Sequence, residues 1–155
     1  MDTANEALII KENRLLRNNE EIGRFENALE SIINNENYKD IKYLCAAFDD
    51  STENDEIMFG LIHAIESYDS MFDVADTMTE FVKSIPEVIV YGREWIKILI
   101  KRILNDKNSI QVYIDVFNDC DNNIKSTLIT LMNEIKCENP DRFESSVDMI
   151  LACLM

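Results

Sequence analysis

The sequence predicts an all-α protein, and two observations carry that prediction. Apolar residues recur at intervals of three and four along most of the chain, which is the spacing of one helix face. Only 3 of the 155 residues are glycine, which argues against β-sandwiches and barrels, because these folds need many tight turns. With 46% hydrophobic residues, the chain can bury a substantial core, and its length predicts one domain over residues 1–155.

Eight stretches carry the helical pattern. They are 22–33, 41–48, 58–65, 74–85, 88–103, 110–117, 124–135 and 143–154. Within the fifth stretch the run Glu87–Gly92 (EVIVYG) could compete as a strand, but its continuation into Trp95 favours a helix. We therefore expect about eight or nine helices joined by short loops.

Capping residues mark the expected helix starts. Asp50 and Ser51 are expected to cap a helix that begins at Thr52 or the next residue, because a short side-chain oxygen can accept a free N–H of the first turn. Pro86 and Pro140 are expected in first turns, where the missing N–H costs nothing.

The expected helix starts also repeat. Starts near positions 53, 87 and 123 are separated by 34 and 36 residues, a period typical of two-helix repeats. Two architectures follow from this pattern: a HEAT-like stack of helical hairpins, or a compact helical bundle.

The charge is large and unevenly distributed. The net charge is -15, which repels nucleic acid and anionic membranes, so we expect neither as a partner. Residues 43–82 contain ten acids and no Lys or Arg, whereas residues 83–107 contain six bases and three acids. The acidic segment is either a solvated face with helix N-terminal charges or a surface for a basic partner. The candidate partner-binding residues are Asp49, Asp50, Glu53, Asp55, Glu56, Asp69, Asp73 and Asp76.

Sites for catalysis or metal are not indicated by any motif. One histidine cannot supply a di-iron bundle, which needs two E-x-x-H pairs. The run Asp119–Asn123 lacks the glycine and glutamate of a calcium loop. We therefore expect no enzyme activity, catalytic residue, metal or cofactor. An enzyme with an unrecognised carboxylate or metal site is a further alternative.

The expected compartment is the cytoplasm. The N-terminus lacks a basic start followed by an apolar run, and no stretch approaches a membrane span. The four cysteines include no C-x-x-C pair and fall at or beside apolar helical positions, as expected of reduced thiols.

A group of polar residues is expected to stabilise the interior. His63, flanked by Ile62 and Ile65, is expected to be buried and hydrogen-bonded. Glu66 could pair across helices with Arg102 or Arg93. Trp95 lies on an apolar stripe and is expected in the core.

Two segments resemble a known family. The first runs from Phe48-Asp-Asp-Ser-Thr-Glu53 to Leu61-Ile-His-Ala-Ile-Glu66, and the second is Glu94-Trp-Ile-Lys-Ile-Leu-Ile-Lys-Arg-Ile-Leu-Asn105. Over residues 44–106 the chain resembles the immunity protein 30 family of bacterial polymorphic toxin systems. The positions that match the family pattern are His63, Glu66, Trp95, Arg102 and Asn105. The resemblance implies that these five residues mark an internal polar network of the fold.

The resemblance implies a small helical protein that binds and neutralises a cognate toxin. The expected mechanism is stoichiometric occlusion of a basic toxin domain, such as a nuclease, through the acidic surface. The alternative is a helical scaffold or adaptor with no toxin partner, and the oligomeric state is open.

Overall fold

Helices form the whole of the ordered secondary structure in the computed structural model, which describes residues 2–154. The all-α prediction is therefore confirmed, and the described residues contain eight α-helices and no strand. The α-helices are α1 (Thr3–Glu12), α2 (Asn19–Ile33), α3 (Ile41–Cys45), α4 (Asp55–Ser67), α5 (Val74–Asn105), α6 (Ile110–Asp119), α7 (Asn122–Glu138) and α8 (Pro140–Cys153). Short 3₁₀ turns lie at Tyr38–Asp40, Tyr68–Ser70 and Lys107–Ser109.

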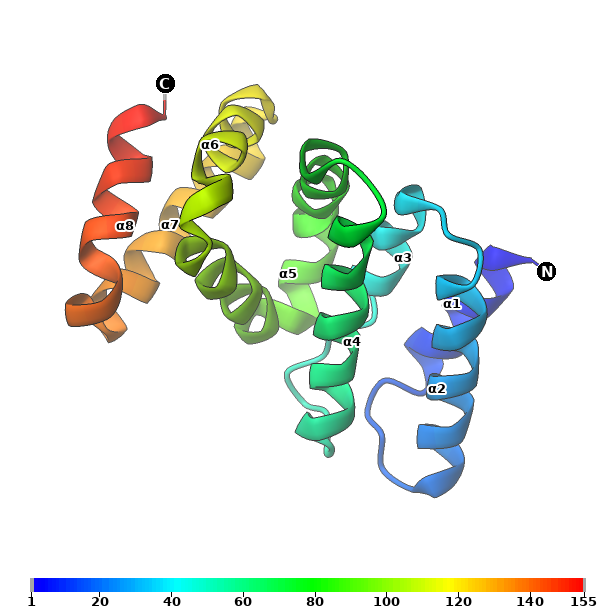
Figure 1. Ribbon diagram of the computed structural model, residues 1–155. Helices are drawn as coiled ribbons and strands as arrows, with labels where there is room; N and C mark the ends of the chain where they lie inside the picture. The colour runs from blue at the N-terminus through cyan, green and yellow to red at the C-terminus, as the bar shows by residue number, and fades with distance from the viewer. Residues whose placement is uncertain (1, 155) are drawn as a thin grey trace.

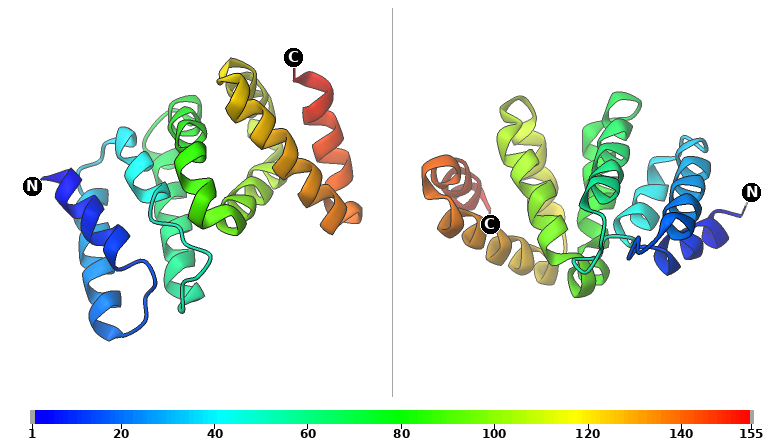
Figure 2. Two further views of the ribbon diagram at one scale, coloured as in Figure 1. Left: turned by 180° about the vertical axis from the view of Figure 1, so that it is seen from behind. Right: turned by 90° about the horizontal axis from the view of Figure 1, so that it is seen from below.

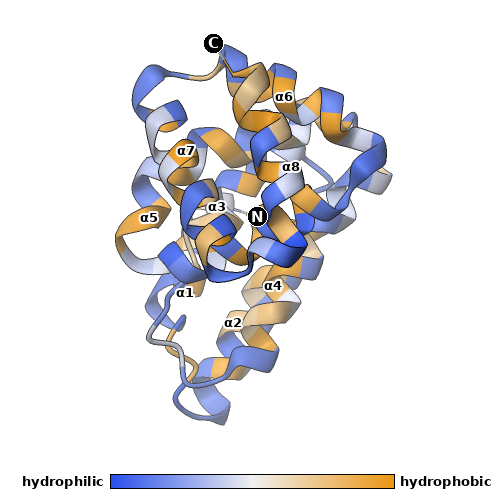
Figure 3. Cartoon of the chain, turned by 90° about the vertical axis from the view of Figure 1, so that its left-hand side faces the viewer, coloured by the Kyte–Doolittle hydropathy of each residue, from blue (hydrophilic) through white to orange (hydrophobic). Residues whose placement is uncertain are grey.

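The helices form a curved row with the two termini at opposite ends (Figures 1 and 2). α1 packs on α2 at one end and α7 packs on α8 at the other. α5 lies in the middle and contacts α3, α6 and α7. Each labelled helix presents both hydrophobic and hydrophilic residues (Figure 3), because only its inward stripe is needed to bury the shared core. Phe25, Phe48 and Phe117 are fully buried in that core.

The start of α4 differs from the prediction. Neither Asp50 nor Ser51 caps it; α4 begins at Asp55, and the Asn54 side chain accepts from the N–H of Ile57 at 3.1 Å. Asn also ranks among the strongest N-caps. The Asp50 carboxylate instead accepts from the backbone N–H of Glu94, inside α5.

The predicted helix start at Pro86 is wrong. Pro86 lies inside α5, where its exposed ring costs one helical hydrogen bond without ending the helix. The break comes six residues later at Gly92, whose φ of -121° and ψ of 31° are not helical. α5 therefore consists of two helical segments that meet at a bend.

Among residues 2–154, no helix has both the length and the apolar character needed to cross a bilayer. All four cysteines are free; Cys45 is buried, Cys120 is half-buried, and Cys137 and Cys153 are exposed.

Candidate partner-binding surface

The eight acids proposed from sequence do not form one patch. Asp49 to Glu56 lie before and within the first turn of α4, whereas Asp69, Asp73 and Asp76 lie beyond its C-terminus. α4 has 13 residues, so it separates the two groups by about 20 Å at roughly 1.5 Å per residue. Each group has to be considered as a surface of its own.

Asp49 is a structural residue. It is 6% exposed, and its Oδ2 forms an ion pair with Arg14 Nε at 3.0 Å. Its Oδ1 also accepts from the N–H of Ser51 at 2.8 Å. Arg14 in turn lies over the ring of Tyr91, 4.4 Å from its centroid. Its carboxylate is therefore already neutralised inside the fold, because a buried carboxylate needs an internal cation and donors.

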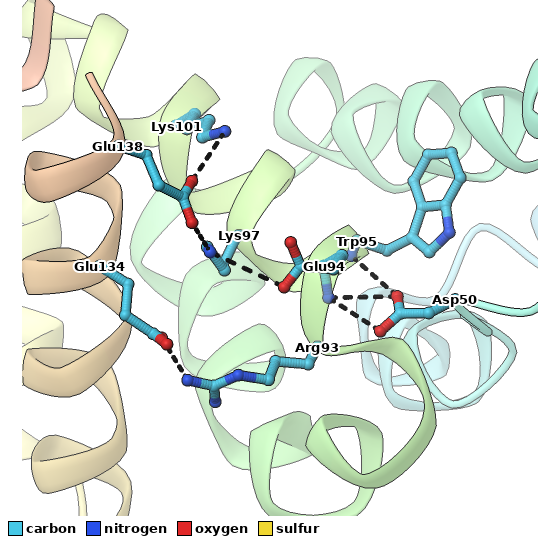
Figure 4. A network of polar contacts seen from close by, with 8 residues as sticks. All are labelled: Asp50, Arg93, Glu94, Trp95, Lys97, Lys101, Glu134 and Glu138. Atoms are coloured by element: carbon cyan, nitrogen blue, oxygen red, sulfur yellow. Dashed lines mark hydrogen bonds and ion pairs between the residues drawn. The ribbon is translucent and has the colours of Figure 1, made fainter.

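Asp50 caps the second segment of α5. Its two carboxylate oxygens each accept from the N–H of Glu94 at 3.1 Å, and Oδ1 also accepts from the N–H of Trp95 at 3.4 Å (Figure 4). The N–H of Asp50 donates to the carbonyl of Tyr91 at 2.7 Å. The bend at Gly92 exposes new N–H groups, and a carboxylate from a distant loop satisfies them.

Two acids of the second group also make internal contacts. Asp73 caps α5 by accepting from the N–H of Ala75 at 3.0 Å. Asp69 accepts from the hydroxyl of Thr77 at 2.5 Å. Burial raises the pKa of Asp69, and the nearby carboxylates of Glu66 and Asp106 act in the same direction.

Four of the eight acids are left for a partner. Glu53, Asp55, Glu56 and Asp76 are exposed, and their side chains make no hydrogen bond or ion pair within the described residues. Asp55 and Glu56 lie in the first turn of α4 and Asp76 in the first turn of α5, where negative charge is favourable. Because no neighbouring base neutralises them, these four carboxylates contribute a negative electrostatic field that extends beyond the protein surface.

Four of the six bases of the basic segment, by contrast, are paired internally. Arg93 pairs with Glu134, and Lys97, only 3% exposed, pairs with Glu138 (Figure 4). Lys101 approaches the same Glu138 at 3.8 Å. These contacts join the second segment of α5 to α7, so the positive charge stabilises the fold.

Sequence reasoning missed Glu134 and Glu138, although a signal existed. They are four residues apart on α7, and Arg93 and Lys97 are four residues apart on α5. Two helices with matching i,i+4 charges of opposite sign can pair along their length. That complementarity indicates which helices could be neighbours.

The predicted polar network is reduced to one ion pair. Arg102 Nε and Nη2 donate to the two carboxylate oxygens of Glu66 at 2.6 and 2.8 Å. His63 and Asn105 are exposed and lie outside this pair. The expectation of a buried His63 is wrong because, at about 100° per residue, it lies about 150° from the centre of the α4 apolar stripe Met58–Ile65.

Trp95 is buried as expected, at 5% exposed. Its ring stacks on Phe48 with centroids 6.2 Å apart and meets the edge of Phe59 at 5.1 Å. The tryptophan thus fixes the start of the second α5 segment against the loop that carries Asp50.

A small cavity lies beside the Glu66–Arg102 pair, between α4, α5 and α6. Its volume is about 140 Å³, which is small beside the ~300–1,000 Å³ of ligand pockets. The hydroxyl of Tyr113 donates to Asp106 there at 3.0 Å, and burial raises the pKa of Tyr113. Within residues 2–154, no group of three or more His, Cys, Asp or Glu side chains is placed to hold a metal ion.

Comparison with known proteins identifies the family. The model of the immunity protein 30 family matches residues 12–113, from the end of α1 through α5 into α6. Comparison with curated proteins and with solved structures gives no match. The matched region covers the acidic segment, the Gly92 bend and the Glu66–Arg102 pair, and the chain belongs to the immunity protein 30 family.

Proposed function

We propose that the protein binds and neutralises a cognate toxin of a bacterial polymorphic toxin system. Membership of the immunity protein 30 family is the observation that carries this proposal. The inhibition is non-catalytic and stoichiometric: the immunity protein occupies a surface that the toxin needs for its activity, and no cofactor takes part.

The toxin surface in this proposal is basic. The net charge of -15 and the unpaired acids Glu53, Asp55, Glu56 and Asp76 support this part, because opposite charge accelerates association and suppresses wrong partners. A nuclease is one toxin class with such a surface, since it has to hold a phosphate backbone.

Co-expression tests the proposal. The toxin domain encoded beside this gene is expressed alone, with the immunity protein, and with an unrelated acidic protein of similar size. We expect growth only with the immunity protein, and a one-to-one complex on size exclusion with light scattering. Failure of both rescue and complex formation would favour the helical scaffold without a toxin partner.

A further inference from the structure

An apolar groove lies between the first segment of α5, α6 and the start of α7. Its volume is about 390 Å³, within the range of binding pockets. The apolar side chains that line it are Ala75, Val82, Val112, Val116 and Ile124. Val112 and Ala75 are only partly buried, so a partner could cover further apolar surface here.

Four aspartates surround this apolar floor: Asp76, Asp115, Asp119 and Asp121. Asp121 caps α7 by accepting from the N–H of Asn123 at 2.7 Å. Asp76, Asp115 and Asp119 are exposed, and no base among the described residues forms an ion pair with them. Among the described residues that line the groove, Lys83 is the one cation.

The spacing of the rim acids suggests the shape of the occupant. Asp115 and Asp119 are one helical turn apart on α6, so they lie on the same face of the helix, about 6 Å apart. A partner helix with Lys or Arg four residues apart matches that spacing while its apolar face covers the groove floor.

We propose that this groove binds a basic amphipathic helix of a partner protein, and that the partner is the toxin; the second part rests on the proposed function. A second copy of this chain is a poor occupant. The copy would add its own net charge of -15, and Arg93, Lys97 and Arg102 already have internal carboxylate partners.

A synthetic amphipathic helix of leucine and lysine is the first probe. It is titrated into the full ¹⁵N-labelled chain, with a leucine–glutamate helix as the control. We expect chemical-shift changes confined to the groove around Thr79, Val112 and Val116 for the lysine peptide alone. Changes spread over all acidic helices would overturn the proposal, because they would indicate nonspecific attraction.

Matched variants separate the groove from net charge. Asp115→Lys with Asp119→Lys is compared with Glu26→Lys and Glu30→Lys, an exposed pair four residues apart on α2. Both double variants change the net charge equally. We expect the groove pair to raise the peptide Kd by about tenfold or more and the α2 pair by less than about twofold. Equal weakening would overturn the proposal.

The apolar floor of the groove is tested with a substitution that leaves the net charge of the protein unchanged. Ala75→Trp places a ring in the groove and is expected to lower the affinity for the lysine peptide by about tenfold. Its far-UV spectrum and unfolding midpoint are measured alongside; if the variant is unfolded, the exposed aspartate pair alone decides the outcome.

The toxin domain is the second probe and distinguishes the two proposals. If the wild-type chain forms the toxin complex and the groove pair binds as tightly, the groove inference fails while the proposed function stands. If the wild-type chain forms no toxin complex but the lysine peptide binds in the groove, the docking site stands and the toxin partner fails. We expect the wild-type chain to form the toxin complex. We expect the Asp115→Lys, Asp119→Lys variant to bind the toxin domain with an affinity about tenfold or more lower.

Discussion

A Cβ atom on Gly92 would lie 2.6 Å from the Cβ of Phe48 and 2.9 Å from the Phe48 carbonyl oxygen. The chain therefore bends at a point where only a hydrogen fits between two backbones. Phe48 is fully buried and stacks on Trp95, so it has little room to retreat.

Gly92→Ala should therefore lower the free energy of unfolding by about 1–3 kcal/mol, as overpacking does. Gly60→Ala is the control, because a Cβ there meets nothing within 4 Å. Inside α4 that change should raise the free energy by about 0.5–1 kcal/mol. Urea unfolding followed by circular dichroism measures both. A stabilised Gly92→Ala would contradict the close approach.

Asp50→Ala should cost about 1 kcal/mol of unfolding free energy, because it leaves the N–H groups of Glu94 and Trp95 without their cap. Glu53→Ala serves as the control, since Glu53 is exposed and its side chain makes no hydrogen bond in the described structure. Thermal unfolding of the two variants compares them. If both lose the same stability, Asp50 is not a cap.

The stretches predicted from sequence cover α2 to α8 but miss α1 (Thr3–Glu12), and the remote contacts between helices are predicted poorly. Apolar stripes such as Met58–Ile65 follow from local periodicity, and the folded protein buries these same stripes in its core. The place of the bend depends on Phe48, and the role of Asp50 depends on Glu94, both far away along the chain. Pro86 was a local signal that the tertiary structure overrides.

At the candidate site, too, local sequence signals were informative and contacts between remote segments were not predictable. Charge totals correctly identified an acidic segment, and the Glu66–Arg102 pair was among the predicted pairings. Composition could not distinguish Asp49, which is buried against Arg14, from Glu53, which is exposed. That difference depends on which helix packs over each carboxylate.

Glu21→Gln should reduce the loss of stability in acid. The Arg17 side chain and backbone N–H donate to the Glu21 carboxylate and lower its pKa from 4.5 to about 2; Arg24 contributes in the same direction. A lowered folded-state pKa gives stability that is present above the unfolded value and is lost as the pH falls from about 4.5 toward 2.

Urea midpoints at several pH values between 2 and 7 measure this effect. Glu26→Gln on the same helix is exposed and is expected to keep the wild-type pH profile. An unchanged profile for Glu21→Gln would indicate that the Arg17–Glu21 contact does not stabilise the folded state.

The thiols should react in three classes with an aromatic disulfide reagent. Cys137 and Cys153 are exposed and should react first. Burial raises the pKa of the half-buried Cys120, so its reaction with the reagent should be slower. Burial raises the pKa of Cys45 to about 12, so it should react only in denaturant. Removing Cys137 and Cys153 together should abolish the fast phase. A fast Cys45 in native conditions would contradict its burial.

Reversing Glu53, Asp55 and Glu56 to lysine should slow association with the toxin domain and reduce the salt dependence of the rate, because these exposed acids provide a long-range field. Asp50 is left intact, since its loss would also disturb α5. Glu26, Glu30 and Glu144, exposed on α2 and α8, form a control triple with the same change in net charge. Stopped-flow mixing at increasing salt should show a decrease of about tenfold in the association rate for the first triple and a smaller change for the second. Equal slowing would mean that total charge, and not this surface, guides the encounter.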